Sequence, residues 1–282
     1  MARVGVVIVT YRSAPTIDAC LLSLTNASSE PLDVVVVDNA SDDDSAARAE
    51  SHGVTVLRRA ENAGYGRGCN DGIAALGEVE VVVFANPDTV WPQGSIDALV
   101  ALLGSDSRLG LVSPVLVDEK GLPQAIVERD LHLLAVLLGM TRLGRPVRPV
   151  TPSFVDGPLV DVDWLHTAAA VVPRATVDAL GGFDERFFLF AEDADFCRRV
   201  RASGQRVVVA ANVRVTHIGG ASFDASFDRD GSAALRTRAL GTYLEKYQGR
   251  GARRLFGAVG AVVYGIGRHR GQAREAWKAA KR

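Results

Sequence analysis

Apolar residues in the first third of the chain form short β-branched runs, and each run ends in polar residues. These runs are Val4–Thr10, Leu32–Asp38, Val54–Arg58 and Val79–Ala85. Apolar positions at helical spacing lie within Pro15–Thr25, and a second helix is predicted over Gly68–Leu76. Strands that alternate with helices predict a mostly parallel sheet, whose ligands collect at the carboxyl ends of the strands.

A second half of the chain begins near Gly110. Its predicted elements are extended segments over Leu111–Val117 and Asp161–Val172, a mobile loop over Arg142–Pro158, a helix from about Ala191 to Ala202, and strands over Arg206–Ala210 and Val213–Thr216. Residues 1–222 are therefore predicted to form an α/β domain with a Rossmann-like, mostly parallel sheet flanked by helices. Residues 1–110 and 111–222 form its two halves.

The last part of the chain differs in charge from the rest. The segment from Arg250 to Arg282 contains nine Lys and Arg residues and a single acid, Glu275, although the whole chain has a formal charge of −1. We predict a basic helical extension over residues 223–282. Its apolar block, Leu255–Gly267, suits either a helix lying on anionic lipid or a helix packed on the main domain, and the glycines in the block weaken helix formation.

Composition limits the setting of the protein. The three cysteines, Cys20, Cys69 and Cys197, are widely spaced and form no disulfide framework, which favours a reducing compartment. No stretch reaches the roughly 18 apolar residues of a membrane-spanning helix, and the start of the chain does not resemble an export signal. We expect a cytoplasmic protein with no nucleic-acid partner.

Two polar segments follow the first strands. Asp38 closes an apolar strand, where a carboxylate accepts a hydrogen bond from the imide N–H of uracil or thymine, although Asp-Asn-Ala-Ser is also typical of a turn or helix cap. The segment Asn62–Gly72 contains four glycines before a predicted helix, which allows close approach of the backbone to a phosphate. It matches neither GxGxxG nor the GxxxxGK[ST] loop.

The next strand ends in Asn86-Pro87-Asp88, which places Asp88 at the same edge of the sheet. Its oxygen ligands suit Mg²⁺ or Mn²⁺, with the remaining positions taken by water and a diphosphate. His217, at the end of another strand, is a candidate second ligand that would favour Mn²⁺. A single histidine of this kind is more often structural.

The string Glu192-Asp193-Ala194-Asp195 opens a predicted helix after an aromatic block, Phe187–Phe190. Carboxylates in a first turn cap the helix and complement its dipole. An apolar collar also raises the pKa of a carboxyl group, which suits a general base acting on a hydroxyl. The residues alone leave both interpretations of Asp193 open.

Taken in order, these segments resemble family 2 glycosyltransferases, which are inverting enzymes with the GT-A type of fold. The resemblance covers roughly residues 4–222 and is carried by the strings VVIVTYRS, VVDNASDD, NAGYGRGCN, ANPDT, WLHTAAAVV, GGFDERFFLFAEDADFCRR and HIGGAS. It implies that residues 1–110 bind a nucleotide-diphosphate sugar and residues 111–222 bind the acceptor. It also implies a reaction in which Asp193 is the catalytic base and Asp88 meets the metal.

The resemblance implies further site residues. For the nucleotide sugar they are Thr10, Tyr11, Asp38, Asn62, Gly64, Arg67, Asn70, Asn86 and Asp88. On the acceptor side they are Trp164, His166, Thr167 and Glu192, and for Mn²⁺ or Mg²⁺ they are Asp88 and His217. Two places depart from the family pattern. Asn86 stands where many members carry the first Asp of a DxD motif, and His166-Thr167 replaces a small Ser-Gly pair.

The strings are most similar to those of bacterial rhamnosyltransferases, so we expect dTDP-L-rhamnose as the donor, with a UDP-hexose as the alternative. The basic extension suits a glycan or polyprenyl-diphosphate-linked acceptor in cell-wall or polysaccharide synthesis, with residues 250–282 in peripheral contact with the inner face of the cytoplasmic membrane. The rivals are a nucleotidyltransferase and a non-catalytic sugar-binding relative. The segment after the first strand, Thr10-Tyr11-Arg12-Ser13, is not the phosphate loop of a nucleotidyltransferase. The joint presence of Asp38, Asp88, Asp193 and His217 argues against a non-catalytic relative.

Overall fold

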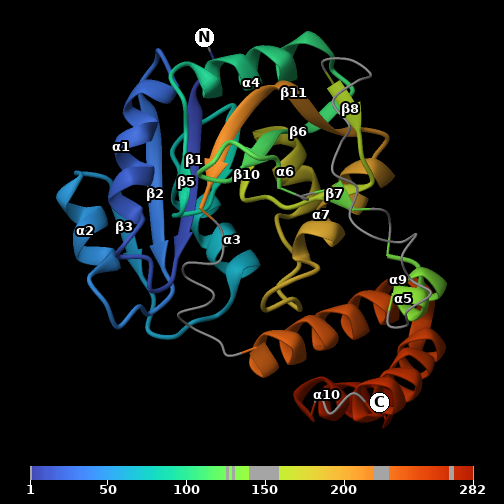
Figure 1. Ribbon diagram of the computed structural model, residues 1–282. Coiled ribbons are helices and arrows are strands. Elements are labelled where there is room, and N and C mark those ends of the chain that lie inside the picture. Colours follow the sequence, from blue (N-terminus) through green and yellow to red (C-terminus); the bar gives the residue numbers. More distant parts are fainter. Residues whose placement is uncertain are drawn as a thin grey trace.

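The computed structural model describes residues 2–124, 127–128, 131–139, 159–218, 229–266 and 270–281. A nine-stranded sheet forms the centre of the molecule, with helices on both faces (Figure 1). Its strands, in spatial order, are β3 (Thr55–Arg58), β2 (Leu32–Asp38), β1 (Val4–Thr10), β4 (Val81–Ala85), β10 (Ala169–Pro173), β6 (Leu109–Val117), β11 (Arg206–His217) and β5 (Thr89–Val90), with β8 (Leu159–Asp161) beside β11. The predicted loop over Arg142–Pro158 lies outside the described residues.

The strand directions confirm a mostly parallel sheet. Strands β3, β2, β1 and β4 are parallel neighbours, and β6 and β11 run the same way because β10 is antiparallel to both β4 and β6. Strands β5 and β8 are antiparallel to β11. Two short strands, β7 (Val127–Glu128) and β9 (Trp164–Leu165), pair separately. The carboxyl ends of six strands therefore lie at one edge of the main sheet.

The helices connect the strands and close the domain. They are α1 (Ile17–Ala27), α2 (Ser45–Ser51), α3 (Tyr65–Ala75), α4 (Ser95–Ser105), α5 (Leu133–Gly139), α6 (Arg174–Leu180), α7 (Glu192–Ala202), α9 (Arg229–Ile266) and α10 (Arg270–Lys281). The three predicted helices of the main domain, α1, α3 and α7, are confirmed. Helix α3 begins three residues before its predicted start because Gly64, with a φ of 93°, turns the chain directly into it.

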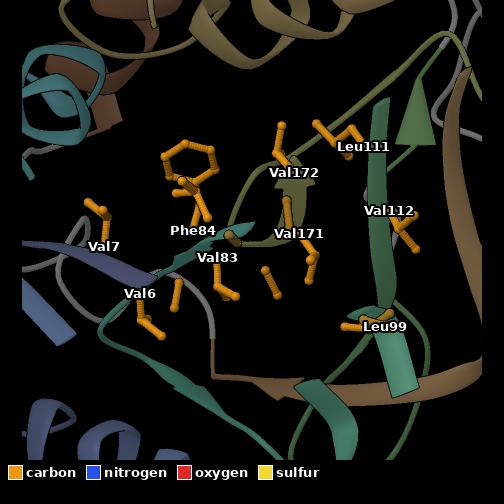
Figure 2. Close-up of a cluster of buried hydrophobic side chains, with 14 of the residues drawn as sticks. Val6, Val7, Val83, Phe84, Leu99, Leu111, Val112, Val171 and Val172 are labelled. Carbon is orange, nitrogen blue, oxygen red and sulfur yellow. The ribbon is translucent and has the colours of Figure 1, made fainter. Parts of the chain in front are cut away.

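The core consists of rows of side chains that run across the sheet. Val6, Val83, Val171 and Val112 are register partners on four neighbouring strands. Figure 2 shows Val6 and Val83 pointing to one side of the sheet and Val7 and Phe84 to the other. Burial on both faces explains why these strands appear in the sequence as continuous apolar runs without alternation.

The glycine-rich segment before and within α3 serves packing. A Cβ atom at Gly72 would lie 2.4 Å from the side chain of Val7, and one at Gly68 would lie 2.8 Å from that of Val9. A Cβ at Gly64 would lie 2.1 Å from the carbonyl oxygen of Phe188. The glycines predicted to admit a phosphate therefore meet strand β1 and the segment before α7.

Strand β11 is continuous where the sequence predicts two separate strands. A register shift against β6 lies between Ala210 and Arg214, so a bulge interrupts the pairing while the strand continues to His217. The extended segment predicted over Asp161–Val172 is instead divided among β8, β9 and β10. Because β11 is parallel to β6, His217 lies at the same edge of the sheet as the ends of β1 and β4.

The C-terminal region is helical, as predicted. Helix α9 is interrupted at Gly249, where φ is 83°, and α10 packs along it (Figure 1). Gly257 allows this contact, because a Cβ there would lie 2.5 Å from the carbonyl oxygen of Ala276. Phe256 and Leu244 are fully buried in a small separate core. Within the described residues no helix is long and apolar enough to cross a membrane.

Candidate active site

A cavity of about 360 Å³ opens at the carboxyl edge of the sheet, between the two halves of the chain. Strand ends and the loop before α3 supply one wall: Thr10, Tyr11, Asn62, Gly64, Asn86, Asp88 and His217. The second half supplies the other wall: His166, Thr167, Phe188, Phe190, Glu192 and Asp193. Most of the residues predicted from the sequence are thus brought together.

Four predicted site residues lie outside the lining of this cavity. Asp38 is buried beside it, in register with Thr10, and accepts a hydrogen bond from the Ser41 N–H at 3.2 Å. Trp164 is buried and meets the His166 ring edge to face, with 5.3 Å between centroids. Their binding roles stay predictions.

The other two residues outside the lining, Arg67 and Asn70, lie on α3 and contact the segment between α6 and α7. Arg67 forms an ion pair with Glu185 at 3.4 Å. The Asn70 side chain exchanges two hydrogen bonds with the Phe183 backbone, at 2.9 and 2.8 Å. Asn70 therefore holds the turn before α7 in place. The nucleotide-binding roles of Arg67 and Asn70 stay predictions.

Unpaired polar atoms gather at this edge of the sheet. Eight buried side-chain polar atoms in the described part of the chain lack a hydrogen-bond partner, and five of them are Thr10 Oγ1, Asp38 Oδ1, Asn39 Oδ1, Asp88 Oδ1 and Glu192 Oε2. Buried polar groups in native proteins are nearly always paired, so such a cluster indicates a ligand site. Asn39 is an addition to the predicted set.

Asp88 and His217 form a candidate metal site. The His217 Nε2 atom lies 3.4 Å from Asp88 Oδ1. Gln124 donates from Nε2 to the His217 carbonyl oxygen at 2.6 Å, which turns its Oε1 toward His217 Nδ1 at 2.8 Å. Nδ1 therefore carries a ring hydrogen, and Nε2 is the ring nitrogen that faces Asp88.

This pair suits Mn²⁺ or Mg²⁺ bound together with a diphosphate. A buried carboxylate oxygen without a hydrogen-bond partner and an imidazole nitrogen are ligands for Mn²⁺, and Asp88 alone suits Mg²⁺. No cluster of three or more His, Cys, Asp or Glu side chains with metal-binding geometry occurs among the described residues. Water and phosphate oxygens would complete the coordination.

Asp193 faces the cavity from the first turn of α7 and is held by the His166-Thr167 pair. Thr167 Oγ1 donates a hydrogen bond to Asp193 Oδ1, and His166 Nδ1 lies 3.4 Å from Asp193 Oδ2. The Tyr65 hydroxyl lies 3.3 Å from Thr167 Oγ1. The residues that depart from the family pattern therefore orient the candidate base directly.

Glu192, the neighbour of Asp193, is only 3% exposed. Burial raises the pKa of its carboxyl group well above the usual value, and the charge of Asp193 raises it further. The raised pKa favours the protonated, neutral form of Glu192. Carboxyl groups with pKa values perturbed by burial and by a neighbouring carboxylate are typical of catalytic sites.

Strained backbone surrounds the cavity. The non-glycine residues with positive φ in the described chain are Arg12, Ala40, Phe190 and Ala191, with values between 54° and 70°. They follow β1 and β2 or precede α7. Such conformations cost about 1–3 kcal/mol each and gather at functional sites, where the fold holds the loops in place.

Comparison with known proteins identifies the family. The sequence model described as Glycosyl transferase family 2 matches residues 5–132. The N-acetylglucosaminyl-diphospho-decaprenol L-rhamnosyltransferase of Mycobacterium tuberculosis is 32% identical over 233 residues, covering 75% of each chain. The chain belongs to glycosyl transferase family 2. It is an inverting, nucleotide-sugar-dependent glycosyltransferase.

Solved structures confirm the GT-A type of fold for this glycosyltransferase. A mannosyltransferase from Pyrobaculum calidifontis, in complex with GDP-Man and Mn²⁺, is 22% identical, with a TM-score of 0.58 over 87% of this chain and 64% of that chain. Glucosyl-3-phosphoglycerate synthase from M. tuberculosis, in complex with Mn²⁺, UDP and phosphoglyceric acid, is 18% identical, with a TM-score of 0.57 over 87% and 78% of the two chains. Both neighbours bind Mn²⁺.

Besides Asn39, three residues of the glycosyltransferase site were missed from the sequence. Gln124 orients His217, Tyr65 contacts Thr167, and Arg236 on α9 lines the cavity. Tyr65 lies within the glycine-rich segment, which was a usable signal. Gln124 and Arg236 lie in segments without a motif, and only the folded chain brings them to the site.

Proposed function

We propose that the enzyme transfers L-rhamnose from dTDP-L-rhamnose to a sugar hydroxyl on a polyprenyl-diphosphate-linked acceptor, with Asp193 as the base. The observation that supports this most is the placement of Asp193, held by Thr167 and His166, in the same cavity as Asp88 and His217. The activity of the mycobacterial relative, an L-rhamnosyltransferase that acts on N-acetylglucosaminyl-diphospho-decaprenol, supports the rhamnosyl group and the acceptor class.

In this mechanism the acceptor hydroxyl gives its proton to Asp193 and attacks the anomeric carbon from the side opposite the leaving group. The bond between that carbon and the diphosphate oxygen breaks as the new bond forms, which inverts the configuration. Thr167 fixes the direction of the Asp193 carboxylate throughout. Asp88 and His217 would hold Mn²⁺ or Mg²⁺, which supplies charge neutralisation to the departing diphosphate.

The nucleotide base would lie against Asp38, Thr10 and Tyr11. Asp38 Oδ1 is buried without a partner and can accept a hydrogen bond from the imide N–H. Thymine and uracil share this group, so a UDP-hexose is the second candidate donor. Cytosine lacks that N–H, and we propose that cytidine-linked donors are rejected.

Replacement of the base tests the assignment. Asp193→Asn keeps the shape of the side chain but cannot take the proton, so kcat should fall by about 10²–10⁴-fold while the Kd for dTDP stays unchanged. Released dTDP or UDP is measured over a panel of nucleotide sugars, with and without Mn²⁺. Near wild-type turnover by Asp193→Asn would remove Asp193 from this role. Transfer with UDP-hexoses alone would overturn the choice of rhamnose.

We also propose that residues 250–282 contact the membrane surface. Leu255, Val262 and Trp277 on α9 and α10 are 49%, 61% and 55% exposed and lie among basic residues. Exposed apolar side chains within a basic helix pair are typical of interfacial binding. Val262→Glu with Trp277→Glu should abolish sedimentation with anionic vesicles, whereas Leu22→Glu, at an exposed site on α1, should not.

A further inference from the structure

One charged side chain of the cavity, that of Arg236, has no function in the mechanism above. Its lining contains three carboxyl groups, those of Asp88, Glu192 and Asp193. Arg236 is the one Lys or Arg among the described residues that line it. A donor diphosphate meets the metal site at Asp88, so Arg236 is free for a second anion.

Helix α9 brings Arg236 to the cavity by docking on α7. Tyr243 and Tyr247 follow Arg236 by seven and eleven residues, which puts all three on one face of the helix. The Tyr247 hydroxyl donates to Asp195 Oδ1 at 2.7 Å, and Lys246 bonds both Asp195 and Asp184. Since Asp195 is fully buried in the first turn of α7, the position of α9 is fixed relative to Asp193.

The side chain of Arg236 is itself held in place. Its guanidinium carbon lies 4.4 Å from the centroid of the Phe190 ring. Phe190 has a φ of 70°, so a strained backbone turns this ring toward α9. Stacking on an aromatic face leaves the N–H groups at the edge of the guanidinium able to donate to an anion, and Arg236 forms no ion pair with a described carboxylate.

We propose that Arg236 binds the diphosphate of the acceptor. The planar guanidinium suits a phosphate, which it can bind through two parallel hydrogen bonds. Phe190 precedes Glu192 and Asp193 by two and three residues, which places Arg236 on the acceptor wall. The nature of the acceptor rests on the proposed function, whereas the binding of a lipid diphosphate can be measured without it.

Binding of farnesyl diphosphate tests the assignment, measured by calorimetry with the donor site filled by dTDP and Mg²⁺. Arg236→Met keeps the aliphatic stem and should raise the Kd for farnesyl diphosphate about 10- to 100-fold. Arg238→Met is the matched control, because Arg238 is exposed on another face of α9. It should bind like the wild type. Arg236→Lys, which keeps the charge without the planar fork, should lie between the two.

Separate arms distinguish the source of the phosphate. The affinity for dTDP, measured alone, should be the same in Arg236→Met and wild type, and a loss there would assign Arg236 to the donor and overturn the proposal. Equal affinity of both proteins for farnesyl diphosphate, or no binding by the wild type, would also overturn it.

Kinetics give a readout that a structural role would not change. The KM of the wild type should be lower for an N-acetylglucosaminyl diphospho-farnesol than for a phosphate-free N-acetylglucosaminide. Arg236→Met should lose this preference, with the KM for the phosphate-free acceptor unchanged. A rise of both KM values together would contradict diphosphate recognition. Failure of the wild type to transfer rhamnose would refute the proposed function and leave the binding result intact.

Discussion

His217 presents Nε2 to Asp88 because Gln124 holds the other ring nitrogen. Gln124→Leu removes the hydrogen bond that orients the ring, so Mn²⁺ affinity in the presence of dTDP should fall about 10- to 100-fold. Gln124→Glu still accepts the Nδ1 hydrogen and should retain most of the affinity. Titration of Mn²⁺ into the dTDP complex measures both. Wild-type affinity in Gln124→Leu would show that His217 is not a ligand or needs no orientation.

Glu192 should make the stability of the enzyme depend on pH. Its pKa is raised by burial, so the native state holds the proton more tightly than the unfolded chain, in which the usual value is near 4.5. As pH rises above that value, through the raised native pKa, the wild type loses stability. Glu192→Gln lacks this titration.

The free energy of unfolding of Glu192→Gln, from urea titrations, should therefore exceed that of the wild type at pH 8. The difference should shrink toward zero near pH 4. A difference that is the same at both pH values would mean that Glu192 does not titrate with a raised pKa.

The sequence predicts the site residues that end apolar strands. Asp38 and Asp88 follow such runs directly, so the general rule for parallel sheets places them at the ligand edge. Gln124 and Arg236 could not be found in this way, because their contacts join segments 93 residues apart in one case and cross from α9 to Phe190 in the other. Side-chain contacts of this kind depend on the finished fold.

At the scale of elements, two glycines of α9 allow the effect of close packing on stability to be measured apart from the effect of helix propensity. A Cβ at Gly257 would collide with the backbone of α10, whereas one at Gly251 would meet nothing within 4 Å. Gly257→Ala should lower the free energy of unfolding by about 1–3 kcal/mol. Gly251→Ala should raise it by about 0.5–1 kcal/mol because alanine favours a helix. Thermal or urea unfolding of the two variants measures both, and equal effects would mean that the α9–α10 contact is not tight.

Element boundaries were harder to predict than the elements themselves. The apolar runs of β1 and β2 appear in the sequence with their observed limits, because strands buried on both faces leave little ambiguity. The bulge that keeps β11 continuous has no local signal in the sequence. The glycines of α9 weaken the local helix preference, and packing against α10 outweighs this cost.

Across the whole molecule, the three cysteines report on the stability of separate helices. Cys20 in α1, Cys69 in α3 and Cys197 in α7 are all buried. Burial raises the pKa of Cys20 and Cys197 to about 12 and that of Cys69 well above its usual value. Iodoacetamide at pH 8 should therefore modify the native protein about 10³-fold or more slowly than the urea-unfolded chain.

Mass spectrometry of tryptic peptides gives a rate for each cysteine. The three rates should be similar if global unfolding exposes them together. Fast modification of one cysteine in the native protein would reveal local opening of its helix.

The position of β10 has a consequence for how such enzymes diversify. This strand comes from the second half of the chain, yet it pairs with β4 of the first half on one side and with β6 on the other. A second half exchanged with that of a relative would bring a foreign β10 against β4, and its side chains would have to fit the core around Val83 and Phe84. Point changes in the segments around Thr167 and Phe190 alter the acceptor wall and leave this packing intact.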